Sequence, residues 1–199
     1  MKKQILFLSL LPFVTCQASD TQELWFSVAA VTRDYLVAAS EGSKSADHAR
    51  QQLISTYEKL STVLQPYYSK TIVQEFSRHL KDLGTQTIAL IESTKKNDAK
   101  ASANAQEQLR TSSSILSSFL SKTNAYLTFC PTKALTDTYI SSLISMVKNR
   151  FEKRWTDDSQ SYNELRSTTA QLGHAMTQSL TDAFPIKKSM PLTTNKAID

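Results

Sequence analysis

Leu64-Gln65-Pro66-Tyr67-Tyr68-Ser69-Lys70 is the stretch on which the expected fold depends, because helix-type patterning runs up to it and resumes just after it. Pro66 disfavours the helical conformation at Gln65 and has no amide hydrogen to donate, so the preceding helix should stop there. We expect the rings of Tyr67 and Tyr68 to cover one end of the hydrophobic core while their hydroxyls stay in water. The stretch therefore predicts a corner between two helices.

Apolar residues on both sides of this corner recur with the spacing of about 3.6 residues that is typical of helices. Three glycines in 199 residues are too few for the turns of an all-β or dinucleotide-binding fold. The pattern predicts an all-α protein, an up-down helical bundle of about six helices in three αα-hairpins. A three-unit helical solenoid is the alternative, but no residue pattern repeats strictly between the hairpins. The expected helices cover residues 21–40, 45–64, 70–94, 98–121, 133–155 and 158–184.

The same patterning gives expectations for individual faces and boundaries. In the first helix, Trp25 and Thr32 fall at the margin of an apolar stripe made by Leu24, Val28, Val31, Tyr35 and Leu36. The serine-rich face of the fourth helix is expected to be exposed. A loop is expected up to Pro131, and Asp157-Asp158 lies where the turn before the last helix needs helix caps.

The N-terminus, over residues 1–18, is typical of a bacterial secretory signal peptide. A short basic start precedes Ile5 to Val14, which is almost wholly apolar, and small residues precede a cleavage site before Ser19. The apolar run is too short to span a bilayer, which needs roughly 20 residues. We therefore expect a periplasmic or secreted protein. Lipid anchoring at Cys16 is the alternative, although the residues before this cysteine make a poor lipoprotein motif.

The remaining chain divides into an expected helical bundle domain over 19–185 and a flexible C-terminal tail over 186–199. Loss of Lys2 and Lys3 lowers the formal charge from +5 to +3. Because its basic residues are interspersed with acidic ones, we expect no nucleic acid partner. No further segment is long and apolar enough to be a transmembrane helix. Cys130 is the one cysteine that cleavage leaves, so the mature chain has no internal disulfide.

The sequence contains no recognisable catalytic constellation. Serine nucleophile motifs, glycine-rich phosphate loops and dinucleotide fingerprints are absent, which favours a protein that is not an enzyme. The three histidines, His48, His79 and His174, belong to none of the pair spacings that place two metal ligands on one helix face. We expect His79 at the edge of the core, and we expect no metal and no cofactor.

Arg33 is the residue that most suggests a binding site, because it lies one or two positions off the apolar stripe of the first helix. There it could pair with a buried acid or an anionic ligand, or extend its charge into water. Trp25, Tyr35 and Tyr139 are the aromatic residues that could line a pocket with it, although aromatics at helical spacing usually pack in a core. These four residues are the ligand-binding candidates.

Several short motifs, in this order and spacing, carry a resemblance: Leu24-Trp25 with Thr32-Arg33, Pro66-Tyr67-Tyr68-Ser69, Lys81-Asp82, Thr138-Tyr139, and Trp155…Asp158…Tyr162. Together they resemble a poorly characterised all-helical family of bacteria and archaea, whose members tend to read LWxxHxxxTR, PYYG, KDH, THL and WxxDxxxY. The resemblance implies a helical bundle and no established activity. Where the family tends to have histidine, this chain has Val28, Leu83 and Tyr139, so any metal or ligand held by those histidines would be lost here.

These observations favour an exported, non-enzymatic six-helix bundle that acts as a binding or interaction protein. The alternative is a bundle that binds a small molecule or metal between its helices, near Arg33 and the tyrosines. The sequence leaves the identity of the partner or ligand open.

Overall fold

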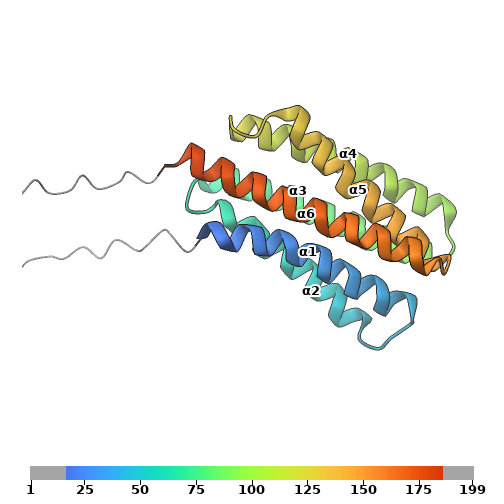
Figure 1. The fold of residues 1–199 in the computed structure, drawn as a ribbon. Coiled ribbons are helices and arrows are strands. Elements are labelled where there is room, and N and C mark those ends of the chain that lie inside the picture. Colours follow the sequence, from blue (N-terminus) through green and yellow to red (C-terminus); the bar gives the residue numbers. More distant parts are fainter. Residues whose placement is uncertain (1–16, 186–199) are drawn as a thin grey trace, which may run out of the picture.

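The computed structural model describes residues 17–185 and shows six α-helices joined by short connections (Figure 1). No strand occurs within these residues, which confirms the expected all-α bundle. The expected signal peptide and tail lie outside the described residues, apart from Gln17 and Ala18, with which the first helix begins. The helices are α1 (Gln17–Ser40), α2 (Ala46–Ser61), α3 (Lys70–Lys95), α4 (Ala99–Thr123), α5 (Phe129–Phe151) and α6 (Trp155–Ala183), with the 3₁₀ helix η2 (Thr62–Leu64) after α2.

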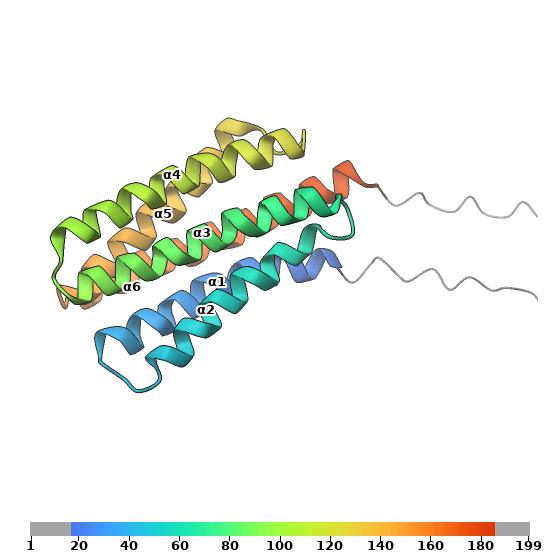
Figure 2. The same cartoon turned by 180° about the vertical axis from the view of Figure 1, so that it is seen from behind.

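The helices form a closed ring. Each helix packs against the next one in sequence, and α6 packs back against α1. α1, α3 and α5 also contact one another, while α2, α4 and α6 each contact two of these three. In both views α3 and α6 lie between the α1–α2 pair and the α4–α5 pair (Figures 1 and 2). A solenoid would keep its first and last helices apart, so the contact between α1 and α6 excludes that alternative. None of the helices in the described part of the chain has both the length and the apolar character that a membrane span requires.

The predicted corner ends α2 through a tight turn. The helix passes into η2, after which the amide of Gln65 donates to the carbonyl of Thr62 at 3.0 Å. Gln65 keeps helical angles of φ −56° and ψ −39°, contrary to the expectation for a residue before proline. This conformation closes a turn in which the carbonyl of Leu64 accepts two later amides. Pro66 therefore ends the α-helix because it has no amide hydrogen to donate, and not by forcing Gln65 into an extended conformation.

Tyr67 and Tyr68 cover one end of the bundle, as predicted. Their ring centroids lie 5.3 and 5.2 Å from that of Phe184, just past the end of α6. Both tyrosines are half-buried and pack against the hydrophobic core. The corner between α2 and α3 thus holds the end of the last helix in place.

The predicted loop before the fifth helix is too long. α5 begins at Phe129, so Pro131 lies in its first turn. The first amides of a helix have no partner within the helix, and the fixed φ of proline suits helical geometry. Proline therefore costs little at this position, and it marks the beginning of the helix rather than the end of the loop.

The turn between the last two helices also lies earlier than predicted. α5 ends at Phe151, and the amide of Arg154 donates to the carbonyl of Asn149 at 2.9 Å. Lys153 closes this turn with a left-handed φ of 60°, a conformation that glycine usually supplies. Asp158 consequently lies inside the first turns of α6 and is not the helix cap that we expected.

Two expectations about helix faces are wrong. Trp25 and Thr32 do not lie at the margin of the buried face, since only 1% and 0% of their surfaces are exposed. They are buried because α1 packs against both α2 and α6. The serine-rich face of α4 is not fully exposed either, because Ser113 and Ser117 are buried against α5. Their hydroxyls lie 2.9 and 2.7 Å from Oγ1 of Thr136, so small polar side chains form the seam between these helices.

Candidate functional site

Arg33 makes an ion pair across the bundle with a buried acid. Both of its terminal nitrogens bond to the carboxylate of Asp158 on α6, with Nη2 to Oδ2 at 2.6 Å. Arg150 on α5 approaches the same carboxylate, with Nη1 3.6 Å from Oδ2, and its Nη2 donates to Glu41 at 2.8 Å. The Asp158 side chain is only 1% exposed, and those of Arg33 and Arg150 are 17% and 12% exposed. A carboxylate this deeply buried requires such pairing, and the pairing connects α1, α5 and α6.

Aromatic rings lie over both guanidinium groups. Cζ of Arg33 lies 5.3 Å from the centroid of Tyr162, and Cζ of Arg150 lies 5.0 Å from that of Trp155. These cation–π contacts add to the ion pair with Asp158. We call these five residues the arginine cluster. The cluster joins Arg33 from one of the short motifs to Trp155, Asp158 and Tyr162 from another, so residues far apart in the sequence support one another.

Trp25 and Tyr35 make their polar contacts elsewhere in the bundle. The indole nitrogen of Trp25 donates to the sulfur of Met176 at 3.0 Å, and the hydroxyl of Tyr35 donates to Glu92 at 2.5 Å. Burial, followed by the hydrogen bond and the charge of Glu92, raises the pKa of Tyr35 far above its ordinary value.

Tyr139 shares a hydrogen bond of 2.6 Å with the hydroxyl of Tyr57 on α2. Burial is the main reason why the pKa of each tyrosine is raised. The ring of Tyr57 packs directly on Gly84. Val28, Leu83 and Tyr139, where the resembling family tends to have histidine, are 0%, 3% and 1% exposed, so these three positions face the interior.

The four predicted ligand-binding residues therefore occupy separate places in the structure. Arg33 lies in the arginine cluster, Tyr139 in the tyrosine pair, and Trp25 and Tyr35 in two further contacts. The structure does not bring them together around one opening. Of the alternatives left open for Arg33, the structure shows the pairing with a buried acid, and ligand binding by these four residues stays a prediction.

The histidines also lie apart from one another. His79 is buried on α3, at the edge of the core as predicted, whereas His48 and His174 are exposed. Among residues 17–185, no three His, Cys, Asp or Glu side chains are grouped in a way that could hold a metal ion.

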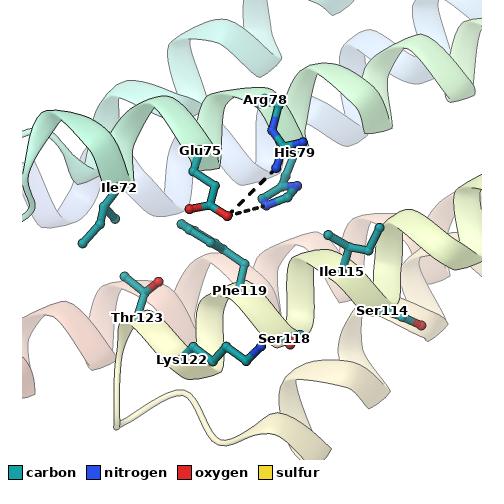
Figure 3. A pocket seen from close by; sticks show the side chains of 10 residues that line it. All are labelled: Ile72, Glu75, Arg78, His79, Ser114, Ile115, Ser118, Phe119, Lys122 and Thr123. Carbon is teal, nitrogen blue, oxygen red and sulfur yellow. Dashed lines mark ion pairs between the residues drawn. The ribbon is translucent and has the colours of Figure 1, made fainter.

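An open groove lies between α3 and α4. It has a volume of about 620 Å³ and contains apolar and charged side chains from both helices (Figure 3). Ile115 and Phe119 of α4 face α3, from which Ile72 and Glu75 point back toward them (Figure 3). Ile115 is 46% exposed, so water covers a large apolar side chain within the groove.

Charges line the groove unevenly. Glu75 lies 4.0 Å from Arg78 and 3.7 Å from Nε2 of His79. Burial and then the charge of Arg78 lower the pKa of His79, so its ring is neutral at pH 7. The ring of His79 packs against Phe119, with centroids 5.2 Å apart. Lys122 also lines the groove, and no carboxylate of the described residues forms an ion pair with it. The groove therefore carries one more cation than anion.

Sequence reasoning did not find this groove. Its walls are α3 and α4, and the distance between these helices depends on how the side chains between them pack, which the sequence does not reveal. The available signal was Ile115, a large apolar residue one position away from the stripe that α4 buries, with Leu116 and Phe119 beside it.

Comparisons of the chain with protein-family models, with curated proteins and with solved structures gave no match. The fold and the groove therefore define the protein only as a six-helix bundle with an open amphipathic groove. Membership of the resembling helical family stays a prediction.

Proposed function

We propose that this protein is an exported, non-enzymatic helical bundle that acts as an interaction protein, with the α3–α4 groove as its binding surface. The observation that carries the proposal is Ile115, an apolar side chain 46% exposed inside a groove that Lys122 also lines, about two turns further along α4 (Figure 3). Exposed apolar surface with a polar rim is typical of interaction sites. The export part of the proposal rests on the apolar N-terminal run from Ile5 to Val14.

The partner that fits the groove is a protein segment with apolar and acidic side chains. The groove follows α3 from Ile72 to His79 and α4 from Ser114 to Thr123, which is about 10 Å along one helix and 14 Å along the other. That length accommodates about two turns of an amphipathic helix, whose apolar residues would pack on Ile115. Acidic residues of the same segment would pair with Lys122.

Peptide selection tests this proposal. Random short peptides are displayed and selected against the chain from Gln17 to Asp199, and affinities are measured by fluorescence anisotropy. We expect acidic amphipathic peptides, and we expect Ile115→Glu to weaken their binding by about tenfold or more, since it places a charge in an apolar contact. Phe26→Glu, at an apolar side chain of α1 that is 41% exposed, is the matched control and should bind like the wild type.

Equal binding by wild type and Ile115→Glu would overturn the assignment of the groove, as would a selection that enriches basic peptides. Binding of a dansyl-labelled fatty acid without any peptide binding would assign the groove to a small amphiphile instead. Turnover of a substrate in a broad hydrolase screen, lost on a single substitution, would refute the non-enzymatic part of the proposal.

A further inference from the structure

One end of the bundle differs chemically from the other. It is formed by the connecting segments 62–70 and 123–130 and by residues 183–185, which we call the aromatic cap. The first and last described residues, Gln17 and Pro185, also lie at this end (Figure 1). The cap thus lies where the chain enters and leaves the bundle.

The aromatic cap is almost free of charge. Its three segments contain no Asp or Glu and a single basic residue, Lys70. At the opposite end, the connections over 41–45, 96–98 and 152–154 contain seven charged residues: Glu41, Lys44, Lys96, Asp98, Glu152, Lys153 and Arg154.

Large apolar rings take the place of charge at the cap. Tyr126, Phe129 and Phe184 are 59%, 45% and 39% exposed. They lie beside the corner formed by Tyr67 and Tyr68, whose rings contact Phe184. Exposed rings on an uncharged surface are costly in water, but they are favourable at the boundary between lipid headgroups and acyl chains.

The sequence around the cap fits the same environment. Lys59 and Lys122 lie in the last turns of α2 and α4, next to the cap, where they suit anionic headgroups. The exposed acids next to the cap are Glu58 and Asp182, in the last turns of α2 and α6. Lys187 and Lys188 follow Pro185 closely in the sequence.

We propose that the aromatic cap docks on the surface of an anionic lipid bilayer. This inference rests on the proposed export of the chain, and it shares one residue, Lys122, with the α3–α4 groove. The rings of Tyr126 and Phe129 enter the headgroup region while the helices stay outside it. Interfacial contacts of this size give reversible binding that needs a second attachment for permanence. We therefore expect docking that dilution reverses.

The chain from Gln17 to Asp199 provides the test, because it keeps all six helices and lacks the apolar run Ile5–Val14. Cys130 is its single cysteine; it is exposed and lies within the cap. An environment-sensitive nitrobenzoxadiazole label at Cys130 should brighten and shift to the blue when phosphatidylcholine–phosphatidylglycerol vesicles are added. The same label moved to the charged end, in the variant Cys130→Ser with Lys153→Cys, should not respond.

Substitutions test which rings carry the binding. Tyr126→Ser combined with Phe129→Ser should lower the vesicle partition coefficient about tenfold or more, because two large apolar contacts are lost. Phe26→Ser, which removes a similarly exposed ring from the side of α1, should leave it unchanged. Sedimentation with vesicles gives both values.

Three results would overturn the proposal. The first is no response of the Cys130 label to any vesicle, and the second is an equal response of the label at Lys153→Cys. The third is a response that grows with protein concentration without vesicles, which would make the cap a contact between two copies of the chain. The peptide measurements with Ile115→Glu are independent of all three, so failure of the groove and failure of the cap are distinguishable.

Discussion

Replacing Asp158 by Asn should destabilise the bundle strongly. The substitution leaves Arg33 and Arg150, with side chains 17% and 12% exposed, next to a neutral amide. Removing one partner of a buried ion pair costs about 3–5 kcal/mol, because the remaining charge stays buried without compensation. The two arginines retain some contact with water, so we expect about 3 kcal/mol. Asp158 also lies near the N-terminus of α6, where a negative charge contributes roughly 0.5 kcal/mol.

Urea denaturation followed by circular dichroism measures this loss. For a domain of this size, about 3 kcal/mol corresponds to a fall in Tm of roughly 6–12 °C. Lys148→Gln is the matched control, because its exposed pair with Glu152 has a separation of 4.0 Å and should contribute less than about 1 kcal/mol. The double variant Arg33→Gln with Asp158→Asn should lose clearly less than the sum of the single variants, by about 1–3 kcal/mol.

A loss for Asp158→Asn no greater than that for Lys148→Gln would refute the reasoning, since it would mean that the arginine cluster does not support the fold. Strict additivity in the double variant would show that Arg33 and Asp158 act separately. Both outcomes come from the same set of urea curves.

Three further substitutions test the tyrosine pair and the groove. Gly84→Ala should cost about 1–3 kcal/mol by overpacking, because its Cβ would lie 2.8 Å from Cδ2 of Tyr57; an unchanged urea midpoint would contradict this packing. Tyr57→Phe should cost about 1–2 kcal/mol, because it removes the hydrogen-bond partner of Tyr139. The double variant Tyr57→Phe with Tyr139→Phe should cost less than the sum of the two single variants. Since burial raises the pKa of both tyrosines, stability should be complete below their ordinary pKa of 10 and fall as the pH rises above it, with tyrosinate absorbance and unfolding appearing together. Burial lowers the pKa of His79, so its contribution should be complete above about pH 6.5 and be lost as the pH falls below it; His79→Gln should flatten this acid dependence of Tm, and an unchanged dependence would assign it to other groups.

Helix patterning was enough to predict the six helices but not all of their ends. Pro66 marks a boundary that the structure contains, because proline acts locally. Pro131 was misleading, since a proline in the first turn of a helix and a proline before a helix look the same in sequence. The turn closed by the left-handed Lys153 gave no signal at all, because lysine has no preference for that conformation.

The arginine cluster shows what sequence could and could not predict about the site. Arg33 stood out because it lies beside an apolar stripe. Its partner was missed because Asp158, adjacent to Asp157, fitted the requirement for a helix cap equally well. The two residues are 125 positions apart, and only the return of α6 to α1 brings them together. Arg33 and Asp158 stood in two separate short motifs, and nothing in the sequence linked one motif to the other.

The contact between α1 and α6 also determines when the bundle can be completed during synthesis. Trp25 bonds to Met176, which lies 151 positions later, and Arg33 to Asp158, 125 positions later. Until the ribosome has released α6, the first helix has no neighbour on that side and its tryptophan faces water. Contacts between such distant parts of a chain form late. A polypeptide whose first helix must wait for its last therefore keeps that face of α1 unpacked until its synthesis is complete.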